Sequence, residues 1–225
     1  MTSQSQRAFI FDMDGTIVDN MAFHTKSWLA FFERRGHVLD ADEFFRATAG
    51  RQGHEIMSTY FGKPMTKEES AALDFEKESL YRELYAPHLA TVNGFEDFIA
   101  RAKNAGVKLA VATAAPNENI DFTLDGLDLR KEFHAIAGAA DVARGKPNPD
   151  VFLLAAERTG TLPVNSIVFE DAPLGVEAAR RAGMRAVVLT TTLPAEAFAE
   201  FDNVIAMARD FSELDVEELF ASVTN

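Results

Sequence analysis

The sequence predicts an α/β protein with a doubly wound parallel sheet and a helical domain inserted after the first strand. Two observations predict this architecture. From about residue 91 onward, short apolar runs alternate with segments of helical spacing. Between residues 17 and 90, helical spacing of Phe, Glu and Lys continues without a convincing strand. Alternating strands and helices are typical of a parallel sheet that helices cover on both faces.

Four short runs of aliphatic and aromatic residues predict buried strands. None of these runs alternates cleanly between apolar and polar residues, which favours parallel strands covered on both faces. Each run ends abruptly at polar or small residues. The predicted strands are Ala8–Phe11, Val107–Ala112, Ser166–Phe169 and Ala186–Leu189.

Helices are predicted between the later strands from their capping residues and apolar spacing. We expect Asn93 to cap a helix that begins near Phe95. We expect Asn148 to cap a second helix with Pro149 as its first residue. A third helix is expected after Asp171.

The insert is predicted to be a second, smaller domain made of helices. The sequence therefore indicates an α/β domain formed by residues 1–16 and 91–225 and a helical domain formed by residues 17–90. The predicted helices of the insert are Met21–Arg35, Ala41–Ala47, His54–Phe61 and Lys67–Tyr85.

The charge balance argues against a nucleic-acid partner. The chain has 22 Lys and Arg residues against 35 Asp and Glu residues, which gives a formal net charge of −13. Non-specific affinity for nucleic acid comes mainly from clustered basic side chains that neutralise phosphates. A small anion can still bind, because a local positive pocket can exist inside an acidic protein.

Cysteine usage and the first residues exclude other kinds of site. The chain has no cysteine, so disulfides, thiolate nucleophiles and Cys-ligated metal sites are excluded. The first seven residues are polar, and Asp12 interrupts the apolar run that follows them. We therefore expect neither a signal peptide nor a membrane span, and we expect a cytoplasmic protein.

Polar residues follow three of the predicted strands at the point where each strand ends, and Lys146 precedes the helix that Asn148 is expected to cap. Ligands of open α/β sheets bind at the carboxyl ends of the strands, so these residues are candidates for one site. Four carboxylates gathered there would repel one another without a cation, and oxygen ligands of this kind favour Mg²⁺. A phosphoryl substrate would complement the accompanying ammonium and hydroxyl groups. The candidates are Asp12, Asp14, Gly15, Thr16, Thr113, Lys146, Glu170 and Asp171.

These residues resemble the four motifs of the haloacid dehalogenase superfamily, and the resemblance spans the whole chain. It implies a Rossmann-like core and a helical cap, as in members close to β-phosphoglucomutase and the sugar-phosphate phosphatases. The segments that carry it are Asp12-Met13-Asp14-Gly15-Thr16, Thr113, Gly145-Lys146-Pro147 and Glu170-Asp171, with Gly175 to Met184 behind the acidic pair.

The resemblance implies catalytic roles for four residues. Asp12 would attack phosphorus and form an aspartyl-phosphate, while Asp14 would protonate the leaving oxygen and later activate water. Thr113 and Lys146 would stabilise the charge of the transferring group. The family's dehalogenases use the same nucleophile against carbon, but the second aspartate is characteristic of the phosphoryl-transfer branch.

The resemblance also implies the ligands of Mg²⁺. Asp12, the backbone carbonyl of Asp14 and Asp171 would hold the ion. Glu170 would bind the ion or lie beside it. Glu170 has an alternative reading as a carboxylate that interacts with the dipole of a helix N-terminus.

Five further residues are candidates for binding the substrate. His24 and Lys77 match a histidine and a lysine of the β-phosphoglucomutase cap, and Arg51 follows Gly50 in a predicted loop. The cap is expected to close over the substrate and to exclude bulk water. The complete set of candidates is His24, Arg51, Lys77, Ala114 and Asn117.

Two departures from the mutase pattern favour a phosphatase that acts on a small sugar phosphate. β-Phosphoglucomutases carry Ser and Lys where this chain has Ala115 and Pro116, and they carry a phosphate-gripping Arg where this chain has Gly53. Arg51 is offset from that position. A β-phosphoglucomutase-type phosphomutase remains the alternative reading.

A catalytically silent regulatory protein is the less favoured reading, because none of the motif residues is lost. We expect the protein to be a monomer or a weak homo-oligomer.

Overall fold

The computed structural model describes residues 6–48 and 53–223. The described chain divides into two compact units. One unit contains the residues up to Asp19 and those from Leu89 onward, and the other is Asn20–His88.

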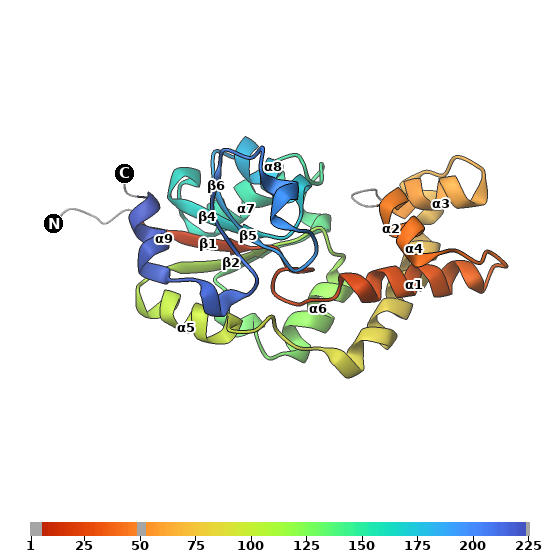
Figure 1. Cartoon of the computed structure of the whole chain (residues 1–225), viewed down its shortest axis with the longest axis horizontal. Coiled ribbons are helices and arrows are strands. Elements are labelled where there is room, and N and C mark those ends of the chain that lie inside the picture. Colours follow the sequence, from red (N-terminus) through yellow and green to blue (C-terminus); the bar gives the residue numbers. More distant parts are fainter. Residues whose placement is uncertain (1–5, 49–52, 224–225) are drawn as a thin grey trace. The chain divides into compact units, whose positions relative to one another are not determined.

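The first unit is built on a parallel sheet of six strands in the order β3-β2-β1-β4-β5-β6 (Figure 1). This topology confirms the predicted doubly wound sheet. Every neighbouring pair of strands is parallel. The strands are β1 (Ala8–Phe11), β2 (Lys108–Ala112), β3 (Ala135–Ala137), β4 (Ser166–Glu170), β5 (Arg185–Leu189) and β6 (Val204–Ala208).

The sequence analysis missed the two edge strands, β3 and β6. Strand β3 has only three residues, Ala-Ile-Ala, which is too short a run to stand out. Strand β6 lies at the other edge, where most of its residues are only partly buried. Its Ala and Met residues have low β-propensity, so the segment resembles a loop in sequence.

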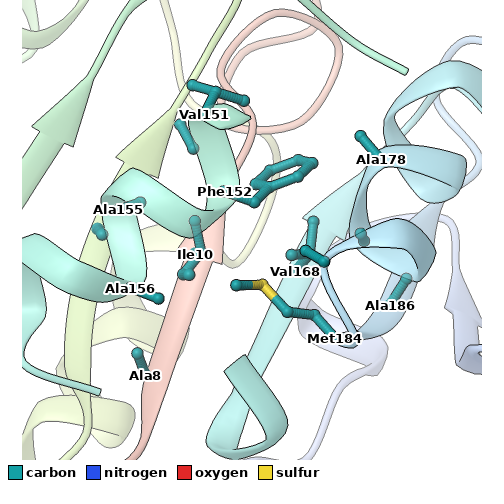
Figure 2. Close-up of a cluster of buried hydrophobic side chains, with 14 of the residues drawn as sticks. Ala8, Ile10, Val151, Phe152, Ala155, Ala156, Val168, Ala178, Met184 and Ala186 are labelled. Atoms are coloured by element: carbon teal, nitrogen blue, oxygen red, sulfur yellow. The ribbon is translucent and has the colours of Figure 1, made fainter. Parts of the chain in front are cut away.

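Alternate residues of the central strands face different helices. Ala8 and Ile10 of β1 belong to a buried cluster with Val168 of β4 and Phe152 of α7 (Asp150–Thr159), as Figure 2 shows. The figure also shows Met184 and Ala186 in this cluster, beside Ala178 of α8 (Pro173–Arg181). Helices α7 and α8 therefore cover one face of the sheet.

The opposite face carries a layer of phenylalanine rings. The rings of Phe11 and Phe169 stack with centroids 4.6 Å apart, and the rings of Phe9 and Phe98 stack at 5.6 Å. Phe98 comes from α5 (Phe95–Asn104), which covers this face. The layer consists of Phe9, Phe11, Phe95, Phe98, Phe169 and Phe211, all fully buried.

The N-cap predicted for α5 is wrong by one residue. Gly94, not Asn93, caps the helix, with φ of +78° in the left-handed region that glycine tolerates. A Cβ at position 94 would lie 2.5 Å from the backbone nitrogen of Ser212. The Asn93 side chain instead donates to Oδ2 of Asp210 at 3.0 Å, so it ties the preceding loop to the segment before α9 (Val216–Val223).

The N-cap predicted for α7 is also wrong by one residue. Pro149 occupies the N-cap position, and the helix begins at Asp150. The backbone N–H and the side-chain amide of Asn148 both donate to the carbonyl of Gly145 at 3.0 Å. Asn148 therefore closes the loop that carries Lys146. The helix expected after Asp171 is α8, which begins at Pro173, and Gly183 follows its end with φ of +73°.

The second unit consists of four α-helices and a short 3₁₀ segment within its described residues. Thr66 and Glu69 form a capping box at the start of α4, with the Thr66 N–H donating to Glu69 Oε2 at 2.7 Å. The unit has an aromatic and aliphatic core of Trp28, Phe31, Phe32, Phe44, Ile56, Met57 and Leu80. The helices are α1 (Met21–Glu33), α2 (Ala41–Thr48), α3 (Gly53–Phe61) and α4 (Lys67–Tyr85).

A helix that crosses a lipid bilayer must be both long and apolar. In the described part of the chain, no helix combines the length and the apolar character needed to cross a membrane.

Replacement of a ring in the phenylalanine layer should destabilise the first unit. Phe98→Ala removes a fully buried ring between the sheet and α5, and we expect it to lower the free energy of unfolding by about 3–5 kcal/mol. Phe75→Ala is the control, because Phe75 is 57% exposed, and its effect should stay within about 0.5 kcal/mol. Urea denaturation followed by circular dichroism measures both. Equal effects of the two variants would contradict this account of the layer.

Candidate active site

The register of β1 and β4 brings Asp12 and Glu170 to the same edge of the sheet. Phe11 pairs with Phe169, and the Asp12 N–H donates to the Phe169 carbonyl at 2.9 Å. Asp12 follows Ile10 by two residues, and Glu170 follows Val168 by two, so both side chains continue the face that α7 and α8 cover. Asp12 is 6% exposed and Glu170 is 1% exposed. Two carboxylates are therefore buried side by side.

Lys146 joins these two carboxylates. Its Nζ donates to Asp12 Oδ1 at 2.5 Å and to Glu170 Oε1 at 2.7 Å. The Lys146 side chain is only 11% exposed, and its ammonium lies 4.9 Å from the ring centroid of Phe152. The ammonium compensates part of the negative charge that the strand ends bring together.

The start of α8 fixes the second oxygen of Glu170. Glu170 Oε2 accepts the backbone N–H groups of Asp171 and Ala172, both at 2.8 Å. Unpaired N–H groups at a helix N-terminus favour negative charge. The Glu170 carboxylate is thus held between Lys146 and the N-terminus of α8, so both readings predicted for Glu170 are compatible with its position.

Glycine at position 175 makes room for this arrangement. A Cβ there would lie 1.7 Å from Glu170 Oε1 and 2.0 Å from its Cδ. Any larger residue at position 175 would displace the Glu170 carboxylate or the helix.

Burial and mutual repulsion perturb the ionisation of the cluster. Burial, together with the charges of Glu170 and Asp14, raises the pKa of Asp12 to about 7, although Lys146 opposes the change. Burial and the charges of Glu170 and Asp12 raise the pKa of Asp171 well above its usual value. Burial alone would lower the pKa of Lys146, but Asp12 and Glu170 outweigh it and raise that pKa. One ammonium does not neutralise three carboxylates.

The donor set fits a small divalent cation. Asp12, Glu170 and Asp171 each offer a carboxylate oxygen, and these oxygens all lie within 4.8 Å of one another. Oxygens on opposite sides of a Mg²⁺ ion are about 4.2 Å apart, since each Mg–O distance is about 2.1 Å. Only a small adjustment is needed, and a cation would relieve the repulsion that raises the pKa of Asp12.

Asp14 lies in a tight turn directly after Asp12. Gly15 has φ of +80°, and its N–H donates to the Val18 carbonyl at 2.8 Å. Asp14 is partly buried, and its charge is among those that raise the pKa of Asp12. The turn therefore keeps the second aspartate close to the first.

Thr113 and its neighbours follow β2 at the same edge of the sheet. Thr113 is 1% exposed, its N–H donates to the Ala137 carbonyl, and its Oγ1 accepts the Ala115 N–H at 3.0 Å. Ala114 is exposed, and Asn117 is the exposed first residue of α6 (Asn117–Gly126). These candidates line the strand end without a direct bond to the carboxylate cluster among the hydrogen bonds of the described residues.

His24 and Lys77 form a separate cluster within the helical unit. Lys77 is 3% exposed, and its Nζ lies 3.0 Å from His24 Nδ1 and 2.8 Å from Glu78 Oε1. The His24 ring stacks on Tyr81 with centroids 3.9 Å apart. An ammonium can only donate, so Nδ1 accepts and a neutral His24 carries its proton on Nε2. Arg51 lies outside the described residues.

Three residues with evident structural roles at this edge were not identified as such from the sequence. Gly175 accommodates Glu170, Asn148 closes the Lys146 loop, and the Thr191 hydroxyl donates to the Gly15 carbonyl. Thr191 belongs to a run of three threonines directly after the predicted strand Ala186–Leu189. The strand-end rule that selected the other residues applies to this run as well.

We expect Mg²⁺ to stabilise the protein through these carboxylates. At a concentration of 100 times its dissociation constant, a ligand of the native state adds about 2.7 kcal/mol to the free energy of unfolding. Asp171→Asn should remove most of this gain, whereas Asp202→Asn, at an exposed position, should retain it. Thermal unfolding with and without Mg²⁺ measures the effect.

The pH dependence provides a second readout of the same site. Because the pKa of Asp12 is raised to about 7, protons compete with the cation below that pH, and the Mg²⁺ effect should be smaller at pH 6 than at pH 8. If Mg²⁺ stabilises Asp171→Asn as much as it stabilises the wild type, the ion binds elsewhere.

Gly175→Ala should disturb the site without changing its charge. The added methyl group pushes Glu170 away from Lys146, and overpacking of this kind costs about 1–3 kcal/mol. We expect lower stability and a weaker Mg²⁺ effect in the same unfolding assay. Gly145→Ala adds the same group where no atom lies within 4 Å, so its stability should stay near that of the wild type. A Gly175→Ala protein that behaves like the wild type would contradict the steric argument.

Comparison with known proteins identifies relatives over nearly the full chain. Residues 9–189 match the haloacid dehalogenase-like hydrolase family. A validoxylamine A 7'-phosphate phosphatase of Streptomyces hygroscopicus subsp. limoneus is 31% identical over 212 residues, which cover 91% of this chain and 94% of that protein. The fructose-1-phosphate phosphatase YqaB of Escherichia coli (strain K12) is 33% identical over 178 residues, which cover 79% of this chain and 93% of that protein.

Solved structures of other proteins have the same fold as this chain. The crystal structure of a HAD hydrolase, family IA, variant 3, from Entamoeba histolytica HM-1:IMSS matches with a TM-score of 0.91 and 24% identity, over 98% of this chain and 100% of that one. At this identity the likeness shows the shared fold. The family match and the two relatives above 30% identity go further, and they confirm the family indicated by the motifs. The chain is an enzyme of the haloacid dehalogenase-like hydrolase family.

Proposed function

We propose that the protein is a Mg²⁺-dependent phosphatase that hydrolyses a small sugar phosphate, or a related phosphorylated metabolite, through an aspartyl-phosphate on Asp12. The observation that carries the proposal is the buried Asp12 carboxylate, held 2.5 Å from the Lys146 ammonium beside Glu170 and Asp171. Phosphoric monoester hydrolysis is further supported by the two relatives, which are both named as phosphatases.

In the first proposed step, a carboxylate oxygen of Asp12 attacks phosphorus. The new bond joins Asp12 to phosphorus, and the bond from phosphorus to the substrate oxygen breaks. Asp14 gives a proton to that leaving oxygen, which departs as an alcohol. Lys146 keeps Asp12 oriented and favours its ionised form, because its ammonium opposes the rise in the pKa of Asp12.

In the second step, water replaces the aspartyl group. Asp14, now ionised, takes a proton from a water molecule whose oxygen attacks phosphorus. The bond to Asp12 breaks, and orthophosphate and the free carboxylate are released. Bound Mg²⁺ would supply positive charge that stabilises the transferring phosphoryl group and helps to hold that group in the site. The proposed ligands of the ion are Asp12, the Asp14 carbonyl and Asp171. Glu170 is proposed to bind the ion or to lie beside it.

Thr113 and Lys146 are proposed to stabilise the oxygens of the transferring group. Thr113 is buried at the end of β2, and the side chain of Lys146 is only 11% exposed, so both act where a charge–dipole interaction is stronger than in water. The N–H groups at the start of α6 and the exposed side chain of Asn117 lie further along the same loop. We propose that Ala114 and Asn117 contact the substrate there.

The helical unit is proposed to select the substrate. His24 and Lys77 are its candidate contacts, and stacking on Tyr81 with a bond between their nitrogens holds both side chains in fixed positions. The names of the two relatives support a polyol or sugar phosphate as the substrate class.

A phosphomutase is the second candidate, and two local features disfavour it. Ala115 is 5% exposed and Pro116 caps α6, so neither offers a group for a second phosphate. At position 53, a Cβ would lie 2.2 Å from Asp74 Oδ1. A carboxylate therefore occupies the space into which a phosphate-gripping side chain would grow, and hydrolysis is the simpler outcome.

The test is phosphate release from a panel of sugar phosphates with and without Mg²⁺. We expect Mg²⁺-dependent release, and we expect Asp12→Asn to lower it by at least about 10³-fold, since the change removes the carboxylate that is proposed to attack phosphorus. Asp14→Asn should lower it by about 10²- to 10⁴-fold through loss of acid–base catalysis. Asp202→Asn, a neutralised aspartate at an exposed position, should match the wild type.

The same preparations separate the two candidate activities. Conversion of β-glucose 1-phosphate to glucose 6-phosphate without phosphate release would establish the mutase. Release that persists in Asp12→Asn would rule out the proposed nucleophile.

A further inference from the structure

The segment after β5 reaches past a neighbouring strand to the turn that holds Asp14. Strand β5 is separated from β1 by β4 in the sheet. Nevertheless, the Thr191 hydroxyl donates to the carbonyl of Gly15, which lies 176 positions earlier in the chain. The preceding residue, Thr190, directs its hydroxyl to the Ala208 carbonyl of β6 at 3.3 Å. Two adjacent threonines therefore anchor opposite sides of this segment.

The bond from Thr191 completes the fixation of the Asp14–Gly15 turn. On one side, the Gly15 N–H donates to the Val18 carbonyl. The peptide that supplies the Gly15 N–H also contains the carbonyl oxygen of Asp14. On the other side, the Gly15 carbonyl accepts from Thr191, and the Thr16 N–H of the same peptide donates to the Met13 carbonyl. Both peptide planes around Gly15 are thus oriented by hydrogen bonds.

The space beside Gly15 is filled by Asp171 and the same threonine run. A Cβ at position 15 would lie 2.1 Å from Asp171 Oδ2 and 2.8 Å from Thr192 Oγ1. The turn therefore packs directly against a carboxylate of the acidic cluster. A small rotation of the turn would change the separation between the Asp14 carbonyl and the Asp171 carboxylate.

We propose that Thr191 is a positioning residue of the hydrolase site. Its hydroxyl fixes the orientation of the Asp14–Gly15 turn. In this orientation the Asp14 carbonyl and Asp171 can bind the same Mg²⁺ ion, and the Asp14 carboxylate can transfer protons. Thr191 acts through Gly15. This inference rests on the proposed function, because it assigns Asp14 the roles given there.

The test compares three variants that alter one hydroxyl at a time. Thr191→Val removes the donor with nearly the same side-chain shape, and Thr191→Ser keeps the donor. Thr190→Val makes the same change one residue earlier, where the hydroxyl bonds to β6. The readouts are the Mg²⁺ dissociation constant by calorimetry without substrate, kcat and KM for the best sugar phosphate, and the free energy of unfolding without metal.

We expect Thr191→Val to weaken Mg²⁺ binding by about threefold to tenfold, which is the range for loss of one neutral hydrogen bond. Its kcat should fall by a similar factor at saturating Mg²⁺, with KM little changed. Thr191→Ser should restore both values, and Thr190→Val should match the wild type in both. Similar unfolding free energies of the two valine variants would show that stability alone does not account for the difference.

Four results would overturn the inference. A Thr191→Val protein with wild-type Mg²⁺ affinity and kcat would remove the positioning role while the phosphatase stands. Equal losses in Thr190→Val, or no rescue in Thr191→Ser, would show that the segment matters only as packing. A wild-type protein that neither binds Mg²⁺ nor releases phosphate would instead overturn the proposed function and this inference with it.

Discussion

Three buried carboxylates share a single ammonium at the carboxyl edge of the sheet, and the architecture of the first unit depends on this excess of negative charge. Lys146 bridges Asp12 and Glu170, and the N-terminus of α8 takes the remaining oxygen of Glu170. Two glycines leave the space that the carboxylates occupy, Gly15 beside Asp171 and Gly175 beside Glu170. The charge that is left uncompensated is what makes a divalent cation, and a phosphate bound with it, chemically suited to this edge.

The layers of the sheet explain how such an unfavourable cluster can be maintained. Burying a charge is costly unless it is paired and hydrogen-bonded, so the surrounding structure must supply the compensating stability. Phenylalanine rings pack one face of the central strands, and aliphatic side chains pack the other beneath α7 and α8. The strand ends inherit fixed positions from this packing, so Asp12 and Glu170 cannot move apart to relieve their repulsion. A rigid site that is destabilised without its ligand binds a cation with little reorganisation.

Sequence reasoning predicted the central parts of the fold better than its edges. Strand β1 and helix α4 have the predicted bounds, because a dense apolar run marks the strand and a long segment of helical spacing marks the helix. Strands β3 and β6 were missed because they are short or half-exposed, and the caps of α5 and α7 were shifted because Asn93 and Asn148 bond within loops. Most of the motif residues could be found because they lie at the end of a predicted strand, and Lys146 because it precedes the helix predicted after Asn148. Gly175 acts by leaving space for Glu170, and Thr191 acts through the backbone carbonyl of Gly15. The spacing of residues in the sequence does not reveal how close two separate elements lie in the fold. For His24, Lys77 and Arg51 the chemistry depends on side-chain orientation toward a substrate, which sequence spacing cannot provide.

The claim at the centre of this account is that the Asp12 carboxylate becomes phosphorylated during turnover. The most direct measurement is rapid acid quenching of the Asp14→Asn protein with Mg²⁺ and a sugar phosphate, followed by peptide mass spectrometry. Acid stops the attack of water on any intermediate that has formed, and the account predicts one added phosphoryl group, removable by hydroxylamine, on the peptide that contains Asp12 in this variant or in the wild type. Phosphate release by the wild type, with no phosphopeptide in either protein or with the phosphoryl group on a different residue, would contradict it.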